Sequence, residues 1–176
     1  MKKTLAILLL SLMAFSVFAN EEPKNEFQVK IGLFPYVESV ICGLGQINNE
    51  GEETMLPVIT AEYLRYVNSR NGIGFSFTYG TPYATFGGEN ANMSYASLGF
   101  TYRGIYMNKE NVKLYGELGV GGELLFSIKN PMCHPLWSFH VSPLGIWFGS
   151  DKFFGTAELT FGSEGFATTL GIGTRF

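Results

Sequence analysis

Large apolar residues alternate with small or polar ones along most of this chain, and that alternation limits what the chain can fold into. In the clearest stretch, 72–80, the two sets are Ile73, Phe75, Phe77 and Tyr79 against Gly74, Ser76 and Thr78. A period of two places successive side chains on opposite faces of a β-strand. Turn-rich clusters separate eight such runs, at about 27–34, 55–67, 72–80, 93–106, 112–127, 137–148, 153–161 and 166–176. The pattern predicts an all-β protein, because no window after Pro23 favours a helix.

The lengths of the runs and of their connections favour a membrane barrel. Most runs reach the about nine to eleven residues of a tilted membrane strand, whereas strands in soluble proteins commonly have about five or six. The connections alternate between tight ones (68–71, 107–111, 149–152) and longer ones (35–54, 81–92), with 128–136 intermediate and 162–165 short. We therefore expect an eight-stranded antiparallel up-and-down transmembrane β-barrel, with its large apolar side chains outward.

The first 19 residues have the pattern of a cleaved signal peptide. A basic start, Met-Lys-Lys, precedes an apolar run from Leu5 to Phe18, and the small residue Ala19 marks the expected cleavage position. The run is shorter than the about 20 apolar residues of a transmembrane helix. We expect export and a single mature domain, 20–176, in the outer membrane of a Gram-negative bacterium.

Composition excludes several classes of function. Only 15% of the residues are charged and the net charge is −3, with no basic patch, so we expect no nucleic-acid partner. The two cysteines, Cys42 and Cys133, are not spaced with His134 or His140 as metal ligands would be, so we expect no metal and no cofactor. Because both cysteines lie in connections at the same end, they could form a disulfide; the alternative is two free thiols.

Charged residues also occur on the inward parity of the strands. They are Lys30, Glu62, Arg103, Glu117, Glu158 and Arg175. We interpret these three bases and three acids as a balanced interior ion-pair core, since buried charges persist only when they are paired. The alternative is an ion path, but side chains normally fill an eight-stranded barrel and leave no open pore.

Two features of the aromatic residues bear on strand register. Tyrosines and tryptophans near the strand ends suit an interfacial girdle, although β-propensity alone also enriches them: Tyr36, Tyr63, Tyr66, Tyr102, Tyr106, Trp137 and Trp147. Placing Trp147 outward would turn Leu144 and Ile146 inward, so we expect a register change at 143–145, where Pro143 cannot donate to a ladder.

The last residues, 169–176, resemble the C-terminal signal of outer-membrane barrels. Thr169, Gly171, Thr174 and Phe176 occupy its characteristic positions, although that family prefers a larger apolar residue than Thr174. The resemblance implies recognition by the barrel-assembly machinery. The mature chain is also similar to small outer-membrane barrels of the OmpX and OmpW type and to those abundant in Bacteroidetes, in phrases such as 27–32, 114–119 and 157–162. These resemblances imply outer-membrane lipids as partners.

Two further functional hypotheses come from particular residues. His140, Ser142 and Glu158 resemble the catalytic set of lipid A deacylases, but the Asn-rich stretch of that family is absent and Pro143 follows Ser142 directly. We therefore expect a non-catalytic protein with a structural or surface-interaction role. The acidic connection 35–54 is where we expect an extracellular partner to bind; for Ca²⁺, which carboxylate oxygens suit, the alternative is a solvated loop without a bound ion.

A soluble, exported, lipocalin-like ligand carrier is the alternative from another class. It requires the large apolar residues of the strands to form a core, including Phe75, Phe77, Leu118 and Ile172. The direction in which these four side chains point therefore separates the two hypotheses.

Overall fold

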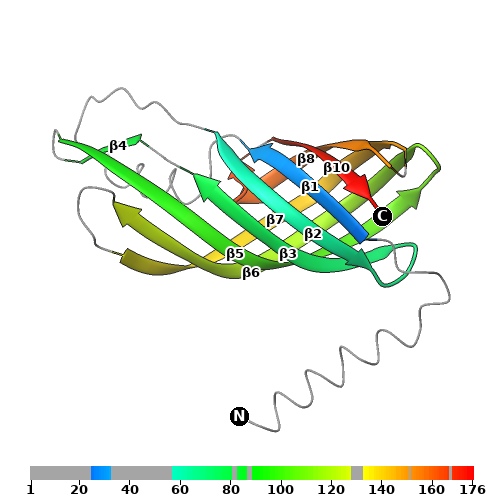
Figure 1. The fold of residues 1–176 in the computed structure, drawn as a ribbon, viewed down its shortest axis with the longest axis horizontal. Helices are drawn as coiled ribbons and strands as arrows, with labels where there is room; N and C mark the ends of the chain where they lie inside the picture. Colours follow the sequence, from blue (N-terminus) through cyan, green and yellow to red (C-terminus); the bar gives the residue numbers. More distant parts are fainter. Residues whose placement is uncertain are drawn as a thin grey trace, which may run out of the picture.

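The computed structural model describes residues 25–32, 57–80, 83–86, 89–127, 133–150, 152–166 and 168–176 (Figure 1). Its strands are β1 (Asn25–Gly32), β2 (Val58–Tyr66), β3 (Asn71–Gly80), β4 (Tyr83–Phe86), β5 (Glu89–Asn108), β6 (Val112–Ser127), β7 (Cys133–Gly149), β8 (Phe154–Gly162), β9 (Gly165–Phe166) and β10 (Thr169–Arg175). Within these ranges, no helix has both the length and the apolar character needed to cross a membrane.

The strands close into a barrel. The sheet runs in the order β10, β1, β2, β3, β5, β6, β7 and β8, every pairing is antiparallel, and β8 also pairs with β10. This confirms the predicted eight-stranded antiparallel barrel. The short strands β4 and β9, which the alternation did not predict, pair with β5 and β8 outside the eight-stranded ring.

The wall of the barrel is taller on one side. Strands β5, β6 and β7 contain 20, 16 and 17 residues, whereas β1 and β10 contain 8 and 7. In Figure 1, β5 and β6 extend well beyond β1 at the end away from the tight turns. In the tight turn that follows β2, the side-chain oxygen of Asn68 accepts hydrogen bonds from the backbone N–H groups of Arg70 (2.9 Å) and Asn71 (2.8 Å).

The polarity of the barrel is the inverse of that of a water-soluble protein. Its outer face carries exposed large apolar side chains on every one of the eight strands, and its inner face carries buried Thr, Ser, Glu, Lys and Arg side chains. Phe75, Phe77, Leu118 and Ile172 all lie outside, with 60%, 49%, 53% and 74% of their surface exposed. The side-chain directions that the lipocalin-like alternative requires are therefore not observed.

An apolar cluster fills the interior at the end with the tight turns. It consists of Leu64, Tyr66, Ile105, Tyr115, Trp147 and Phe154, and we call it the apolar plug. The rings of Trp147 and Phe154 stack with centroids 5.1 Å apart. The assignment of Tyr66 and Trp147 to an outer girdle was therefore wrong, because both rings are buried inside the barrel.

A bulge explains why Trp147 points inward. The register between β7 and β8 shifts between Val141 and Leu144, which confirms the expected register change. Pro143 and Leu144 both face outward, so the inward positions move from Ser142 to Gly145 and Trp147. Gly145 then leaves space for a neighbouring ring, since a Cβ at that position would lie 2.4 Å from the ring of Tyr115.

Candidate functional site: the charged interior

Inward parity brings most of the predicted charged residues to one level of the barrel. Lys30, Glu62, Arg103, Glu117 and Glu158 project inward from five different strands, and each is at most 3% exposed. Arg175 lies nearer the tight-turn end and joins this group through Glu26. Because water is excluded from these side chains, each charge depends on its neighbours for stabilisation.

The ammonium group of Lys30 is the centre of the cluster. Its Nζ lies 2.6 Å from Glu62 Oε2, 2.8 Å from Glu117 Oε1, 2.7 Å from Glu164 Oε2 and 3.5 Å from Glu158 Oε2. Four carboxylates from β2, β6, β8 and the turn after β8 therefore converge on one cation. A compact ammonium with three N–H donors suits such a convergence.

The guanidinium group of Arg103 connects Lys30's carboxylates to a second group of residues. Its Nε donates to Glu117 Oε2 at 2.7 Å, its Nη2 donates to Glu62 Oε1 at 2.8 Å, and its Nη1 donates to Glu26. Glu26 in turn accepts a hydrogen bond of 2.8 Å from Arg175 Nη2. The face of Arg103 also lies 4.3 Å from the ring of Tyr115, so the charged cluster and the apolar plug are in direct contact.

The cluster is larger and more acidic than the balanced set of six that the sequence suggested. It includes Glu26 and Glu164, which raises the number of carboxylates to five against Lys30, Arg103 and Arg175. Extending the inward parity one residue before the predicted start of the first strand, at 27, would have found Glu26. No periodic signal could have found Glu164, because it lies in a turn.

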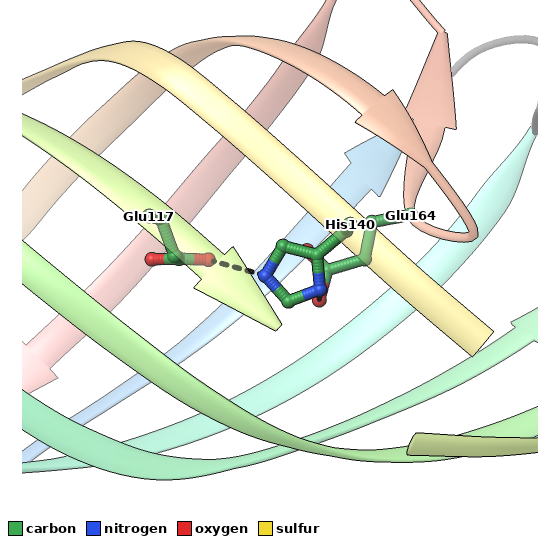
Figure 2. A group of neighbouring side chains, drawn as sticks. All are labelled: Glu117, His140 and Glu164. Carbon is green, nitrogen blue, oxygen red and sulfur yellow. Dashed lines mark hydrogen bonds and ion pairs between the residues drawn. The ribbon is translucent and has the colours of Figure 1, made fainter. Parts of the chain in front are cut away.

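His140 lies between two carboxylates (Figure 2). Its Nε2 is 3.2 Å from Glu117 Oε1, and its Nδ1 is 3.1 Å from Glu164 Oε1. The ligand atoms of these three residues lie within 4.8 Å of one another, as in a metal site. However, the ring separates the two carboxylates, and Lys30 Nζ already contacts both of them. The geometry is therefore that of an ion-pair bridge and not of a chelate.

The hydroxyl of Ser142 is not placed as that of a catalytic nucleophile would be. It donates to Glu158 Oε2 at 3.1 Å and shares a hydrogen bond of 2.8 Å with Thr160. Among the hydrogen bonds of the described residues, none joins Ser142 to His140, and both ring nitrogens of His140 face carboxylates instead. A Ser–His pair in which the imidazole accepts the hydroxyl proton is not formed, and Ser142 lies inside the barrel, fully buried.

The residues of the C-terminal motif lie on β10, the strand that closes the barrel. Thr169 is buried and Phe176 is exposed, and the backbone of Phe176 exchanges two hydrogen bonds with Asn25, of 2.7 and 2.9 Å. Gly171 faces inward, where a Cβ would lie 2.4 Å from Thr156 Oγ1. Thr174 pairs with Phe27 of β1. The motif therefore forms one side of the seam between the first and last strands.

Several predicted features lie outside the described residues. These are the expected signal peptide 1–19, Cys42 and the acidic connection 35–54, together with the side chain of Cys133. The disulfide and the loop partner therefore stay predictions.

Two solved structures share this fold. The N-terminal β-barrel domain of OprF from Pseudomonas aeruginosa matches with a TM-score of 0.57 and 9% identity, over 88% of this chain and 100% of that one. Ail, the attachment invasion locus protein of Yersinia pestis, in complex with the heparin analogue sucrose octasulfate, matches with a TM-score of 0.52 and 16% identity, over 89% and 100%. The fold is that of a small outer-membrane β-barrel.

At these identities the likeness shows the fold alone, because one fold serves many functions. No protein-family description and no curated protein matches the sequence.

Proposed function

We propose that this chain is an integral outer-membrane β-barrel protein of a Gram-negative bacterium, with a structural or surface-interaction role and neither catalysis nor an open pore. The inverted polarity of the barrel carries this proposal. Soluble monomers rarely expose contiguous apolar patches larger than a few hundred Å², whereas here the apolar face continues around all eight strands. Hydrocarbon is the solvent that suits such a surface, and a closed barrel satisfies its backbone groups without water.

The filled interior supports the absence of a pore. The charged cluster occupies the middle of the barrel and the apolar plug occupies the end with the tight turns. Barrels of eight strands have little internal space beyond their own side chains. We therefore expect no steady conductance across planar bilayers, and a steady, ion-selective current would contradict this part of the proposal.

The partners we propose are outer-membrane lipids, the barrel-assembly machinery and an extracellular molecule that binds connection 35–54. Lipid contact follows from the exposed apolar face, and recognition by the assembly machinery rests on the C-terminal motif of β10. The support for a loop partner is the acidic, Gly-rich composition of 35–54. The interior position of His140 and Ser142 and their separate carboxylate partners favour this role over a lipid A-modifying enzyme.

Membrane insertion is tested by combining fractionation with a charge placed on the outer face. Ile172 is 74% exposed near the middle of β10, and Arg at a bilayer midplane costs barrels about 2–4 kcal/mol. Ile172→Arg should lower folding stability in vesicles, whereas Ser69→Arg, in the exposed tight turn after β2, should not. The folded protein should fractionate with membranes and migrate faster on gels unboiled than boiled. A mature chain that stays monomeric in buffer without detergent would overturn the proposal.

A further inference from the structure

The turn between β8 and β9 folds into the barrel instead of pointing away from it. Gly162 pairs with Gly165 and adopts a φ of +134°, which leaves Ser163 and Glu164 as the two residues of the turn. Ser163 is 2% exposed and Glu164 is fully buried. A charged turn residue without solvent contact is unusual, because loop residues normally lie at the surface.

Several contacts hold this turn inside. The backbone N–H of Ser163 donates to Phe139 O at 2.9 Å, and its hydroxyl accepts a hydrogen bond of 2.9 Å from the hydroxyl of Ser138 on the adjacent strand β7. Gly32 provides the space, since a Cβ there would lie 1.8 Å from the carbonyl oxygen of Glu164. The Oε2 atom of Glu164 lies 2.7 Å from Lys30 Nζ, and its Oε1 atom lies 3.1 Å from His140 Nδ1.

Lys30 and Arg103 keep ion pairs with other members of the charged cluster that do not involve Glu164. Lys30 retains Glu62 at 2.6 Å and Glu117 at 2.8 Å without it. Neither oxygen of Glu164 makes a hydrogen bond of good geometry, so its contacts are ion pairs only. With Glu164 in place, the cluster holds five carboxylates against the three bases Lys30, Arg103 and Arg175. Release of Glu164 therefore relieves an excess of negative charge.

The two ends of the interior are closed in different ways. At the end with the tight turns, the apolar plug is packed from six large side chains. Near the level of His140, the inward wall includes the small residues Gly119, Gly121 and Ser138, and Ser138 contacts the turn. Movement of the turn would therefore open the interior at the end with the long connections, and the apolar plug would keep the other end closed.

We propose that the Ser163–Glu164 turn is a lid, latched by Glu164 to Lys30 and His140, that opens the charged interior toward the long connections while the apolar plug keeps the other end closed. The proposal rests on the proposed function only for placing the lid at the cell exterior. When the lid opens, the interior becomes accessible from one side only, so no pore through the membrane is formed.

Thiol accessibility tests the lid. Thr101 lies inward on β5, opposite Gly119, fully buried and with its hydroxyl unpartnered, so Thr101→Cys loses no hydrogen bond. In a background with Cys42→Ser and Cys133→Ser, a water-soluble maleimide should react slowly with this cysteine. Adding Glu164→Ala should raise the rate by at least about tenfold, equivalent to about 1.4 kcal/mol in the opening equilibrium. Glu164→Gln, which keeps the shape and removes the charge, should raise it in the same direction.

Glu123→Ala is the matched control. Glu123 is another buried carboxylate of the interior, 1% exposed and without a hydrogen-bond partner, but it lies on β6 and not on the turn. Its removal should leave the maleimide rate unchanged. Equal rates in the parent and both Glu164 variants, or equal acceleration by Glu123→Ala, would overturn the lid. The folded state of each sample is read from its gel mobility in detergent, so a failure to insert into membranes would count against the proposed function and not against the lid.

Discussion

Removing the ammonium group of Lys30 is the most informative perturbation of the interior. Lys30→Met keeps the unbranched aliphatic stem and removes one cation that contacts Glu62, Glu117, Glu158 and Glu164. All five side chains are buried, so water cannot replace the lost charge. The carboxylates would then repel one another in a medium of low dielectric constant.

The expected loss is large. Breaking a buried ion pair by removing one partner costs about 3–5 kcal/mol, and four carboxylates depend on Lys30, so we expect a loss of at least this size. Native proteins are stable by about 5–15 kcal/mol, which makes the loss a substantial share of the total. Combining Lys30→Met with Glu164→Gln restores the parent's difference between acids and bases, so the double variant should recover about 0.5–3 kcal/mol relative to the sum of the single effects.

The measurement is urea unfolding in phospholipid vesicles, with the folded fraction read from the mobility of unboiled samples on gels. Lys152→Met, at an exposed position in the turn after β7, is the control and should change stability by less than about 0.5 kcal/mol. If Lys30→Met unfolds at the same urea concentration as the parent, Lys30 does not neutralise the interior carboxylates and the reasoning is refuted.

Three further expectations use the same chain. Trp147→Ala should lower stability by about 3–5 kcal/mol because it empties part of the apolar plug, whereas Trp137→Ala, at a side chain 89% exposed, should have a far smaller effect in the same unfolding assay; equal effects would place Trp147 outside. Gly74→Ala should cost about 1–3 kcal/mol, because its Cβ would lie 1.8 Å from a backbone oxygen, whereas Gly122→Ala meets nothing within 4 Å and should be tolerated. Ser142→Ala should leave the acyl chains of lipid A unchanged by mass spectrometry; an acyl chain that returns only in this variant would reveal catalysis.

The sequence alone determined the strands and their two faces. Alternation is a local property, because each residue of a strand points to the side opposite its neighbours. It therefore predicted the inward set of β6, including Lys113, Tyr115 and Glu117, and the outward set that includes Leu118 and Val120. Antiparallel pairing of consecutive strands followed from the short connections.

Tertiary structure decided which of the inward groups meet. Lys30 and Glu117 are 87 residues apart, and their contact depends on the register of every strand between them. A one-residue bulge is enough to reverse the side on which a residue points, and the bulge at Pro143–Leu144 turned Trp147 inward. The burial of Glu164 depends on barrel closure, because a turn can fold inward only where a glycine on a distant strand, Gly32, leaves space for it.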